Sequence, residues 1–361
     1  MRAFALLLLV ATATRGLSAE FSYNRCARNG PLGWGKQCQT GKEQSPIDIC
    51  DEKTMNPRRS IFIENYERQW MVTNTGHALK FTPQPTPYFF TGTDLDLQDL
   101  AKLVGRSDDS SPGWMLAQIH CHLGRKEERG EGSEHALHGK RFPLECHAVH
   151  YNKRFGGGLS AAASSGAKDA LAVVGFFFEV KDEGSPFLDL MTNAYPTDMK
   201  TLESSVDWFE NINDREYYAY NGGLTTPGCN EIVTWIVIEK PMAVSKKAME
   251  VFQAMKVRPG KSDEIISKFG SVRPLQPHNK RTIYSSSSGN TKKCDVDRKP
   301  EQCPSRSIVL DLLFLIIPVI LLGFTCVYLS YTFKVNENKT RRESYVQLKQ
   351  TRHEYVPPMA S

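Results

Sequence analysis

Gln118-Ile119-His120-Cys121-His122 is the most informative stretch of the sequence. A second stretch, Glu145-Cys146-His147, belongs with it, and its histidine follows His122 by 25 residues. Alternate residues of a strand point to the same face, so His120 and His122 lie on one face of the first strand. The run from 144 to 151 has the pattern of a second strand. If the two strands pair antiparallel, three imidazoles meet at one point. Three neutral nitrogen ligands with a fourth position open to water are typical of a catalytic zinc site.

Two polar residues support a metal site, although a lone His-x-His pair occurs often by chance. Gln118 lies two residues before His120, and Glu145 lies two residues before His147, so each can share a face with its histidine. Metal-bound imidazoles usually donate their second N–H to such groups, which sets the tautomer and the orientation of the ring. We therefore predict a zinc site with His120, His122 and His147 as ligands and with Gln118 and Glu145 behind them.

The motifs extend well beyond the histidines. Residues 118–124 read Gln-x-His-x-His-x-Gly, then come Gly132-Ser133-Glu134-His135 and Glu145-x-His147-x-Val149-His150. This set resembles the zinc core of the α-class carbonic anhydrases. Further blocks that resemble the family follow in the family's order, at 44–49, 74–77, 224–227, 233–235 and 273–281. The resemblance covers roughly residues 21–285, and several ordered blocks together are far more specific than any one of them.

The resemblance implies a mainly β (α+β) fold, with a large twisted, mostly antiparallel central sheet and short peripheral helices. The sequence pattern agrees, because short apolar runs bounded by turn residues recur at 60–64, 78–82, 144–151, 171–180 and 232–239. Helical patterns are few, and the best lie at 244–256 and 262–269. Without the terminal segments about 265 residues remain, which is enough for one domain with a single large core.

The family resemblance also implies a reaction, the reversible hydration of carbon dioxide to bicarbonate and a proton. Zinc held by three histidines lowers the pKa of its water to about 7, so zinc-bound hydroxide is the expected nucleophile. Thr225 matches the family threonine that orients this hydroxide by accepting from it and donating to Glu134. His77 matches the proton shuttle, since an exposed imidazole with a pKa near 6.5 relays protons at physiological pH.

A substrate site is implied by the resemblance alone. Carbon dioxide has no net dipole and binds weakly, so it needs a small apolar wall beside the nucleophile. Without the family, the apolar members of this wall would be assigned to the core. The expected substrate-binding residues are Val149, Val173, Leu224, Thr225 and Thr226, with Trp235 behind them.

The first ligand strand departs from the family, which commonly has aromatic side chains at its alternate positions. Here those positions are Ile119, Cys121 and Leu123. Rigid rings behind a metal site hold the rotamers of its ligands, so we expect smaller groups to hold them less firmly and metal retention to be poorer. Cys121 and Cys146 alternate with the ligand histidines, and we expect both to face the core as free thiols rather than as extra ligands.

The two ends of the chain predict its location. Met1-Arg2 precedes an apolar run and then small residues, the form of a secretory signal peptide. Leu312–Phe333 has 22 residues without a charge, enough to cross a bilayer, and the basic residues after it predict a cytoplasmic tail. The predicted parts are a signal peptide 1–19, a catalytic domain 20–285, a polar stalk 286–306, a transmembrane helix 307–333 and a cytoplasmic tail 334–361. We thus expect a single-pass type I protein of the plasma membrane with an extracellular catalytic domain.

Nine cysteines fit an oxidising compartment. By resemblance to secreted members of the family, Cys38 and Cys229 pair with each other. The sequence does not set the remaining connectivity. The pairs left open are Cys26 with Cys50, and Cys294 with Cys303 within one chain or across a dimer.

Charge and composition limit the partners. The formal net charge is only +5, and no stretch combines a basic patch with interleaved aromatic residues, so we predict no nucleic-acid partner. The expected partners are carbon dioxide and bicarbonate, the membrane, a second copy in a homodimer and a bicarbonate transporter. The alternative function is an inactive carbonic-anhydrase-like ectodomain that acts as a binding or adhesion module. Such relatives typically lack a ligand histidine, whereas this chain has all three together with Glu134 and Thr225.

Overall fold

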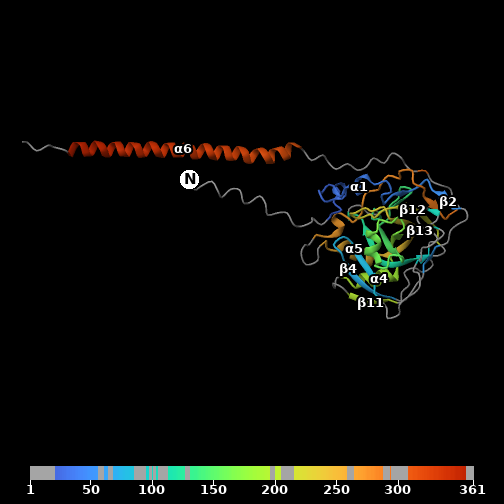
Figure 1. Cartoon of the computed structure of the whole chain (residues 1–361). Helices are drawn as coiled ribbons and strands as arrows, with labels where there is room; N and C mark the ends of the chain where they lie inside the picture. Colours follow the sequence, from blue (N-terminus) through green and yellow to red (C-terminus); the bar gives the residue numbers. More distant parts are fainter. Residues whose placement is uncertain are drawn as a thin grey trace, which may run out of the picture. The chain divides into compact units, whose positions relative to one another are not determined.

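A computed structural model of the whole chain divides into two compact units, residues 1–299 and 300–361 (Figure 1). The structure describes residues 21–55, 61–63, 68–84, 95–96, 100, 103–104, 113–126, 131–195, 200–204, 215–257, 264–287, 293 and 308–354. The predicted signal peptide and nearly all of the predicted stalk lie outside these ranges. The two units are described separately.

The first unit is built on a twelve-stranded sheet. Its main path contains β11 (Lys200–Ser204), β4 (Arg68–Asn74), β5 (Leu79–Pro83), β7 (Trp114–Leu123), β9 (Leu144–Asn152), β10 (Leu171–Lys181), β13 (Val233–Ser245), β12 (Tyr217–Gly222), β14 (Tyr284–Ser285) and β2 (Lys53–Thr54), in that order. Two short strands, β3 (Phe62–Ile63) and β6 (Leu95–Asp96), pair beside this path. A separate small sheet joins β1 (Asp48–Ile49) to β8 (Ala136–Leu137).

The centre of the sheet consists of β7, β9 and β10, which pair antiparallel, while β10 and β13 pair in parallel. β10 contains a nearly continuous apolar run, Leu171–Phe178, because both of its faces are covered. The expected mainly antiparallel sheet with short peripheral helices is confirmed. A register shift between Leu116 and Gln118 places a bulge just before the histidine motif of β7.

Each face of the central strands packs against its own hydrophobic core. The first core includes Ile119, Cys121, Leu123, Cys146, Ala148 and Val174. The second core includes Val149, Val173, Phe177, Trp235 and Val237. Because side chains alternate along a strand, the second core shares its face of β7, β9 and β10 with the histidines. The metal-site residues therefore stand on a sheet that is packed on both sides.

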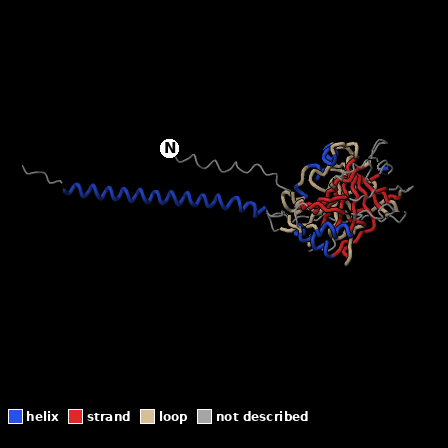
Figure 2. Tube along the Cα trace, turned by 90° about the horizontal axis from the view of Figure 1, so that it is seen from below, coloured by secondary structure: helices blue, strands red, loops and turns tan. Residues whose placement is uncertain are grey.

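Short helices lie outside the strands (Figure 2). They are η1 (Pro31–Gly33), α1 (Lys36–Thr40), α3 (Gly158–Ser164), α4 (Pro186–Asn193), α5 (Lys246–Ala254) and η2 (Ile266–Lys268). The helix expected at 244–256 starts only at Lys246, because β13 continues through Ser245, whose hydroxyl caps the helix by accepting from the N–H of Ala248. The pattern at 262–269 forms only the 3-10 turn η2 within the described residues.

The described part of the second unit forms one helix, α6 (Ile308–Glu354), with Pro318 inside it. Within the described part of the chain, it is the one helix long and apolar enough to cross a membrane, by length and composition. Proline is tolerated in membrane helices. The helix continues past residue 333, so the predicted boundary between span and tail is not the end of a helix.

Candidate metal centre

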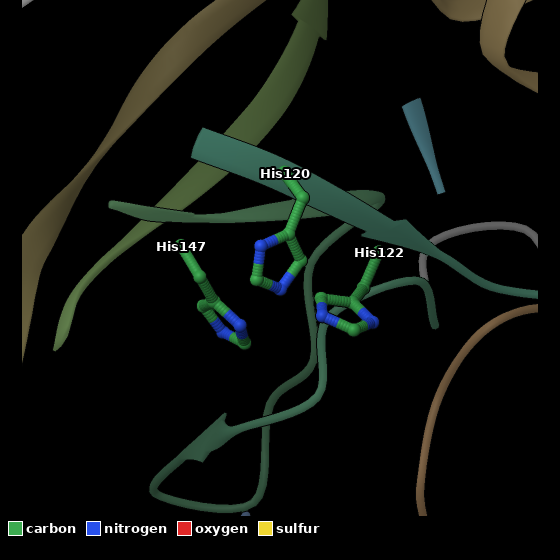
Figure 3. Close-up of side chains that lie close together, drawn as sticks. All are labelled: His120, His122 and His147. Carbon is green, nitrogen blue, oxygen red and sulfur yellow. The ribbon is translucent and has the colours of Figure 1, made fainter. Parts of the chain in front are cut away.

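Three imidazoles meet on one face of the sheet (Figure 3). His120 and His122 come from β7, and His147 comes from β9, directly opposite His120. The ring centroids are 5.0 Å apart for His120 and His122, 5.4 Å for His120 and His147, and 4.7 Å for His122 and His147. One nitrogen of each ring lies within 4.8 Å of the others, so the three can hold a metal ion.

Two of the three rings are oriented by hydrogen bonds. The Nδ1–H of His122 donates to the carbonyl oxygen of Ser271 at 2.6 Å. The Nε2–H of His147 donates to Oε1 of Glu145 at 2.8 Å. These bonds leave the opposite nitrogen of each ring as a lone-pair donor. Nε2 of His122 is buried and has no hydrogen-bond partner among the described residues, which suits a metal ligand.

His120 lacks a comparable contact. Its Nδ1 atom is buried and meets no hydrogen-bond partner in the described part of the chain. Gln118, which we expected to hold this ring, is half-buried two residues earlier on the same strand. The orientation of His120 thus depends on the backbone of β7 and on packing.

Burial favours the neutral form of two ligand rings, His120 and His147. It lowers the pKa of His120 well below its ordinary value, and His122, His147 and Lys80 lower that pKa further. Lys80 contributes because it stands directly opposite His120 on β5. Burial also lowers the pKa of His147, although the carboxylate of Glu145 acts in the opposite direction. Neutral imidazole is the form that binds metals.

Glu145 is the centre of a buried polar network. Burial by itself raises the pKa of its carboxyl, but His135 and His147 together hold that pKa well below its ordinary value. The carboxylate accepts from Nδ1 of His135 at 2.7 Å and from its backbone N–H at 2.8 Å. Nε2 of His135 then accepts from the hydroxyl of Tyr220 at 2.7 Å. The charge of Glu145 is thereby fixed, and so is the tautomer of His147.

Sequence reasoning assigned no role to His135, Tyr220 or Gly175. A Cβ atom on Gly175 of β10 would lie 3.2 Å from Oε1 of Glu145, so glycine leaves room for that carboxylate. A glycine inside an apolar strand commonly marks such a close approach, and this signal was present in the sequence. His135 stands in a quoted motif, but its contact with Glu145 depends on the fold.

A second carboxylate, Glu134, lies beside the imidazoles. Its Oε2 atom is 3.4 Å from Nε2 of His122 and 3.9 Å from Nδ1 of His147. Oε1 accepts from the backbone N–H of Arg273 at 2.9 Å. Oε2 is buried, and the described residues, Thr225 included, give it no hydrogen bond. One carboxylate oxygen therefore remains as an acceptor next to the metal position.

Comparison with known proteins agrees with this centre. A family model of eukaryotic-type carbonic anhydrases matches residues 29–287. Carbonic anhydrase 7 of Mus musculus is 32% identical over 268 residues, which cover 72% of this chain and 94% of the relative. Carbonic anhydrase 4 of Rattus norvegicus is 30% identical over 270 residues, covering 72% and 80%. A putative carbonic anhydrase 5 of Caenorhabditis elegans is 29% identical over 291 residues, covering 77% and 86%.

The chain belongs to the eukaryotic-type carbonic anhydrase family. Carbonic anhydrases are zinc enzymes, and the three histidines of this chain can hold the ion. The predictions of the α-class family, of an enzyme and of a zinc cofactor are thus confirmed.

The expected carbonic anhydrase substrate wall lies on the histidine face of the sheet. Val149 and Val173 belong to the second core, and Leu224 packs against it. Trp235 stands behind them, with its ring 4.8 Å from the ring of His147 and its Nε1–H bonded to the carbonyl of Gly223 at 3.1 Å. The structure therefore brings these apolar residues together beside His147.

His77 lies at the edge of the site on a tight turn, Thr75–Ala78, in which Gly76 has a φ of 83°. Its ring stacks on Phe21 with centroids 3.9 Å apart, and the ring of Tyr23 meets it edge-on at 5.9 Å. The imidazole is consequently half-buried rather than exposed. His77, Phe21 and Tyr23 also line a cavity of about 310 Å³.

Two disulfides flank the centre. Cys38 and Cys229, which the resemblance pairs, are bonded, with Cα atoms 5.1 Å apart. Cys121 and Cys146 are also bonded to each other, so the prediction that they are free thiols was wrong. The error has a simple cause, since the two residues stand directly opposite on β7 and β9, close enough for their sulfurs to join. Cys26 and Cys50 each take part in a disulfide as well.

Proposed function

We propose that this chain hydrates carbon dioxide reversibly at the outer face of a membrane, with zinc held by His120, His122 and His147. The observation that carries the proposal is the meeting of three imidazoles, two of them fully buried, in a chain of the carbonic anhydrase family. Zinc on three neutral histidines supplies hydroxide at neutral pH, because it lowers the pKa of bound water to about 7. The other residues position this nucleophile, receive the substrate and remove the proton.

Thr225 and Glu134 would orient the nucleophile. Oε1 of Glu134 is occupied by the N–H of Arg273, which leaves Oε2 for the Thr225 hydroxyl. A hydroxyl has one proton, so a Thr225 that donates to Glu134 must accept from the attacking group. That contact aims the lone pair of the attacking group at the substrate.

The apolar wall of Val149, Val173 and Leu224 would receive carbon dioxide, with Thr226 beside it. All three side chains stand next to the second core and offer no hydrogen-bonding group. An uncharged linear molecule gains from such a wall, whereas an anionic product does not. The wall thus favours entry of carbon dioxide and departure of bicarbonate.

His77 would carry the released proton to solvent. Its ring lies at the edge of the cleft and borders the cavity formed with Phe21 and Tyr23. Stacking on Phe21 holds the ring in one orientation, in which it can take up a proton at one nitrogen and release another proton from the second nitrogen. This role moves protons but makes no contact with substrate.

Activity and zinc content test the proposal together. Purified full-length protein in detergent should bind one zinc per chain and hydrate carbon dioxide, measured by stopped flow with a pH indicator. Full activity with no bound zinc would overturn the ligand assignment. A zinc-loaded, correctly folded protein without hydration would instead favour the binding module.

The proposed location needs its own experiment. The apolar part of α6 supports a membrane anchor, and the basic residues after it support a cytoplasmic tail. Protease added to intact cells should release a fragment of about 30 kDa, the mass of a domain of roughly 270 residues. An epitope after Ser361 should stay protected. Labelling of that epitope without permeabilisation would reverse the topology.

A further inference from the structure

The most unusual feature of the centre is the disulfide directly beneath it. We propose that the Cys121–Cys146 bridge is a positioning device, which holds β7 and β9 in the register at which the three imidazoles meet and thereby slows the release of zinc. The inference rests on the proposed zinc site, and it assigns a role to two residues that touch neither metal nor substrate.

The place of the two cysteines in the chain is the first argument. Cys121 stands between His120 and His122, and Cys146 follows Glu145 and precedes His147. The bridge is therefore one residue away from all three ligands and from the carboxylate that orients one of them. A displacement of either cysteine moves the backbone that carries the ligands.

Strand register is the second argument. Cys121 lies opposite Cys146, and the neighbouring pairs are His120 with His147 and His122 with Glu145. The covalent bond thus sits on the middle of three successive pairs, and the two outer pairs hold the metal-site groups. A slip or local separation of the strands would part His120 from His147, and the bridge opposes both movements.

The surroundings of the bridge are the third argument. Both cysteines are fully buried in the first core, where their neighbours along the strands are Ile119, Leu123 and Ala148. These neighbours are aliphatic, and we expected such backing to hold the ligands loosely. A covalent link between the strands supplies the stiffness that aliphatic side chains do not.

His120 has the greatest need of this support. His122 is held by the Ser271 carbonyl, and His147 is held by Glu145, whereas Nδ1 of His120 has no hydrogen-bond partner among the described residues. The ring of His120 is therefore positioned by the backbone of β7 and by packing, without a hydrogen bond from the described residues to its Nδ1 atom. The bridge fixes that strand at the next residue.

Removal of the bridge without a cavity tests the inference. Cys121→Ala/Cys146→Val and the mirrored Cys121→Val/Cys146→Ala both keep the number of side-chain heavy atoms and introduce no thiol. Zinc-loaded full-length protein is mixed with excess chelator far below its melting temperature. We expect zinc release about 10- to 100-fold faster in both variants, the range typical for loss of groups that hold metal ligands. The cobalt-substituted variants should show altered absorption bands, because the ligand geometry is less uniform.

The chain offers a matched control in its other disulfide. Cys38→Ala/Cys229→Ala removes a bridge with a sequence separation of 191, whose two cysteines lie outside the ligand strands β7 and β9. This variant should lose thermal stability and yet release zinc within about twofold of the natural rate.

Three results would overturn the proposal. They are natural release rates in the bridge variants, equal acceleration in the control at a matched loss of melting temperature, and failure of both bridge variants to fold where the control folds. The last would show that the bridge serves the whole fold. Failure of the zinc site itself is distinguishable, because His122→Ala would then retain zinc.

Discussion

The floor and the rim of the metal centre are built differently. The floor consists of β7, β9 and β10. Its strands β7 and β9 carry the three imidazoles, and Glu145 and a disulfide hold them from within the sheet. The rim loops, 21–23, 75–78 and 224–229, carry His77 and Thr225 on turns. The rim disulfide ties its loop to Cys38, near the start of the domain. From this difference we expect the floor residues to determine zinc binding and the rim residues to determine the rate of the zinc-loaded enzyme.

The strongest test of the floor is His122→Ala. Removing one of three ligands should abolish hydration and bring zinc content close to zero, because the remaining pair cannot complete the site. Metal analysis and stopped-flow assay would measure both. His138→Asn is a suitable control, because asparagine tolerates the φ of 51° at this position. His138 also lies outside the floor strands and the rim loops. Near-normal activity in a folded His122→Ala protein would contradict the assignment of His122 as a zinc ligand.

The rim should behave in the opposite way at Thr225. Thr225→Ala should lower kcat/KM about 100-fold, comparable to loss of one key polar contact in a transition state, while zinc content stays full. Thr225→Ser should recover much of the rate, because it restores the hydroxyl. Loss of zinc along with activity would show that Thr225 is needed to hold the metal, as the floor residues are.

Glu145→Gln sharpens the definition of the floor. The amide lacks the charge that fixes the tautomer of His147, so zinc affinity should fall about 10- to 100-fold. At saturating zinc the rate should fall much less. Glu179→Gln is the matched control, because Glu179 is a carboxylate at the outer end of β10 that pairs with Lys140 and Lys181. Competition with a chelator measures the affinities, and equal values for the two variants would contradict the role of Glu145.

The smallest expected effect belongs to His77. His77→Ala should lower kcat about tenfold and leave kcat/KM unchanged, a smaller loss than for a general acid or base in the reaction itself, because buffer can take over proton transfer. Added imidazole should restore kcat in a concentration-dependent manner. If added imidazole does not restore kcat, the proton leaves by another path. In that case Phe21→Ala should change kcat as little as His77→Ala does.

Much of the floor could be predicted from sequence. Alternation placed His120 and His122 on one face, and a shared strand pattern placed His147 opposite. The same pairing also predicts the disulfide, because an antiparallel pair that places His120 opposite His147 also places Cys121 opposite Cys146. The two cysteines were interpreted one at a time as core residues, and that is why their bond was missed.

Other contacts gave no sequence signal. The carbonyl of Ser271 orients His122, and the N–H of Arg273 occupies Glu134, but every residue offers a backbone N–H or carbonyl of this kind. Their positions depend on a segment that is 149 and 139 residues away along the chain. Likewise, the end of β13 at Ser245 was set by its pairing with β10, which overrides the helical pattern from Val244 onward.

The separations of the two bridges have a consequence for biosynthesis. Cysteines 25 residues apart leave the ribosome within about 1–5 s of each other at 5–20 residues per second, whereas those 191 apart need roughly 10–40 s. The floor strands can therefore be joined well before Cys229 emerges. Cys38 must wait as a thiol while Cys50, Cys121 and Cys146 emerge as competing partners. Early formation of the Cys121–Cys146 bond removes two of these three competing thiols. This order of bond formation therefore favours the correct pairing of Cys38 with Cys229.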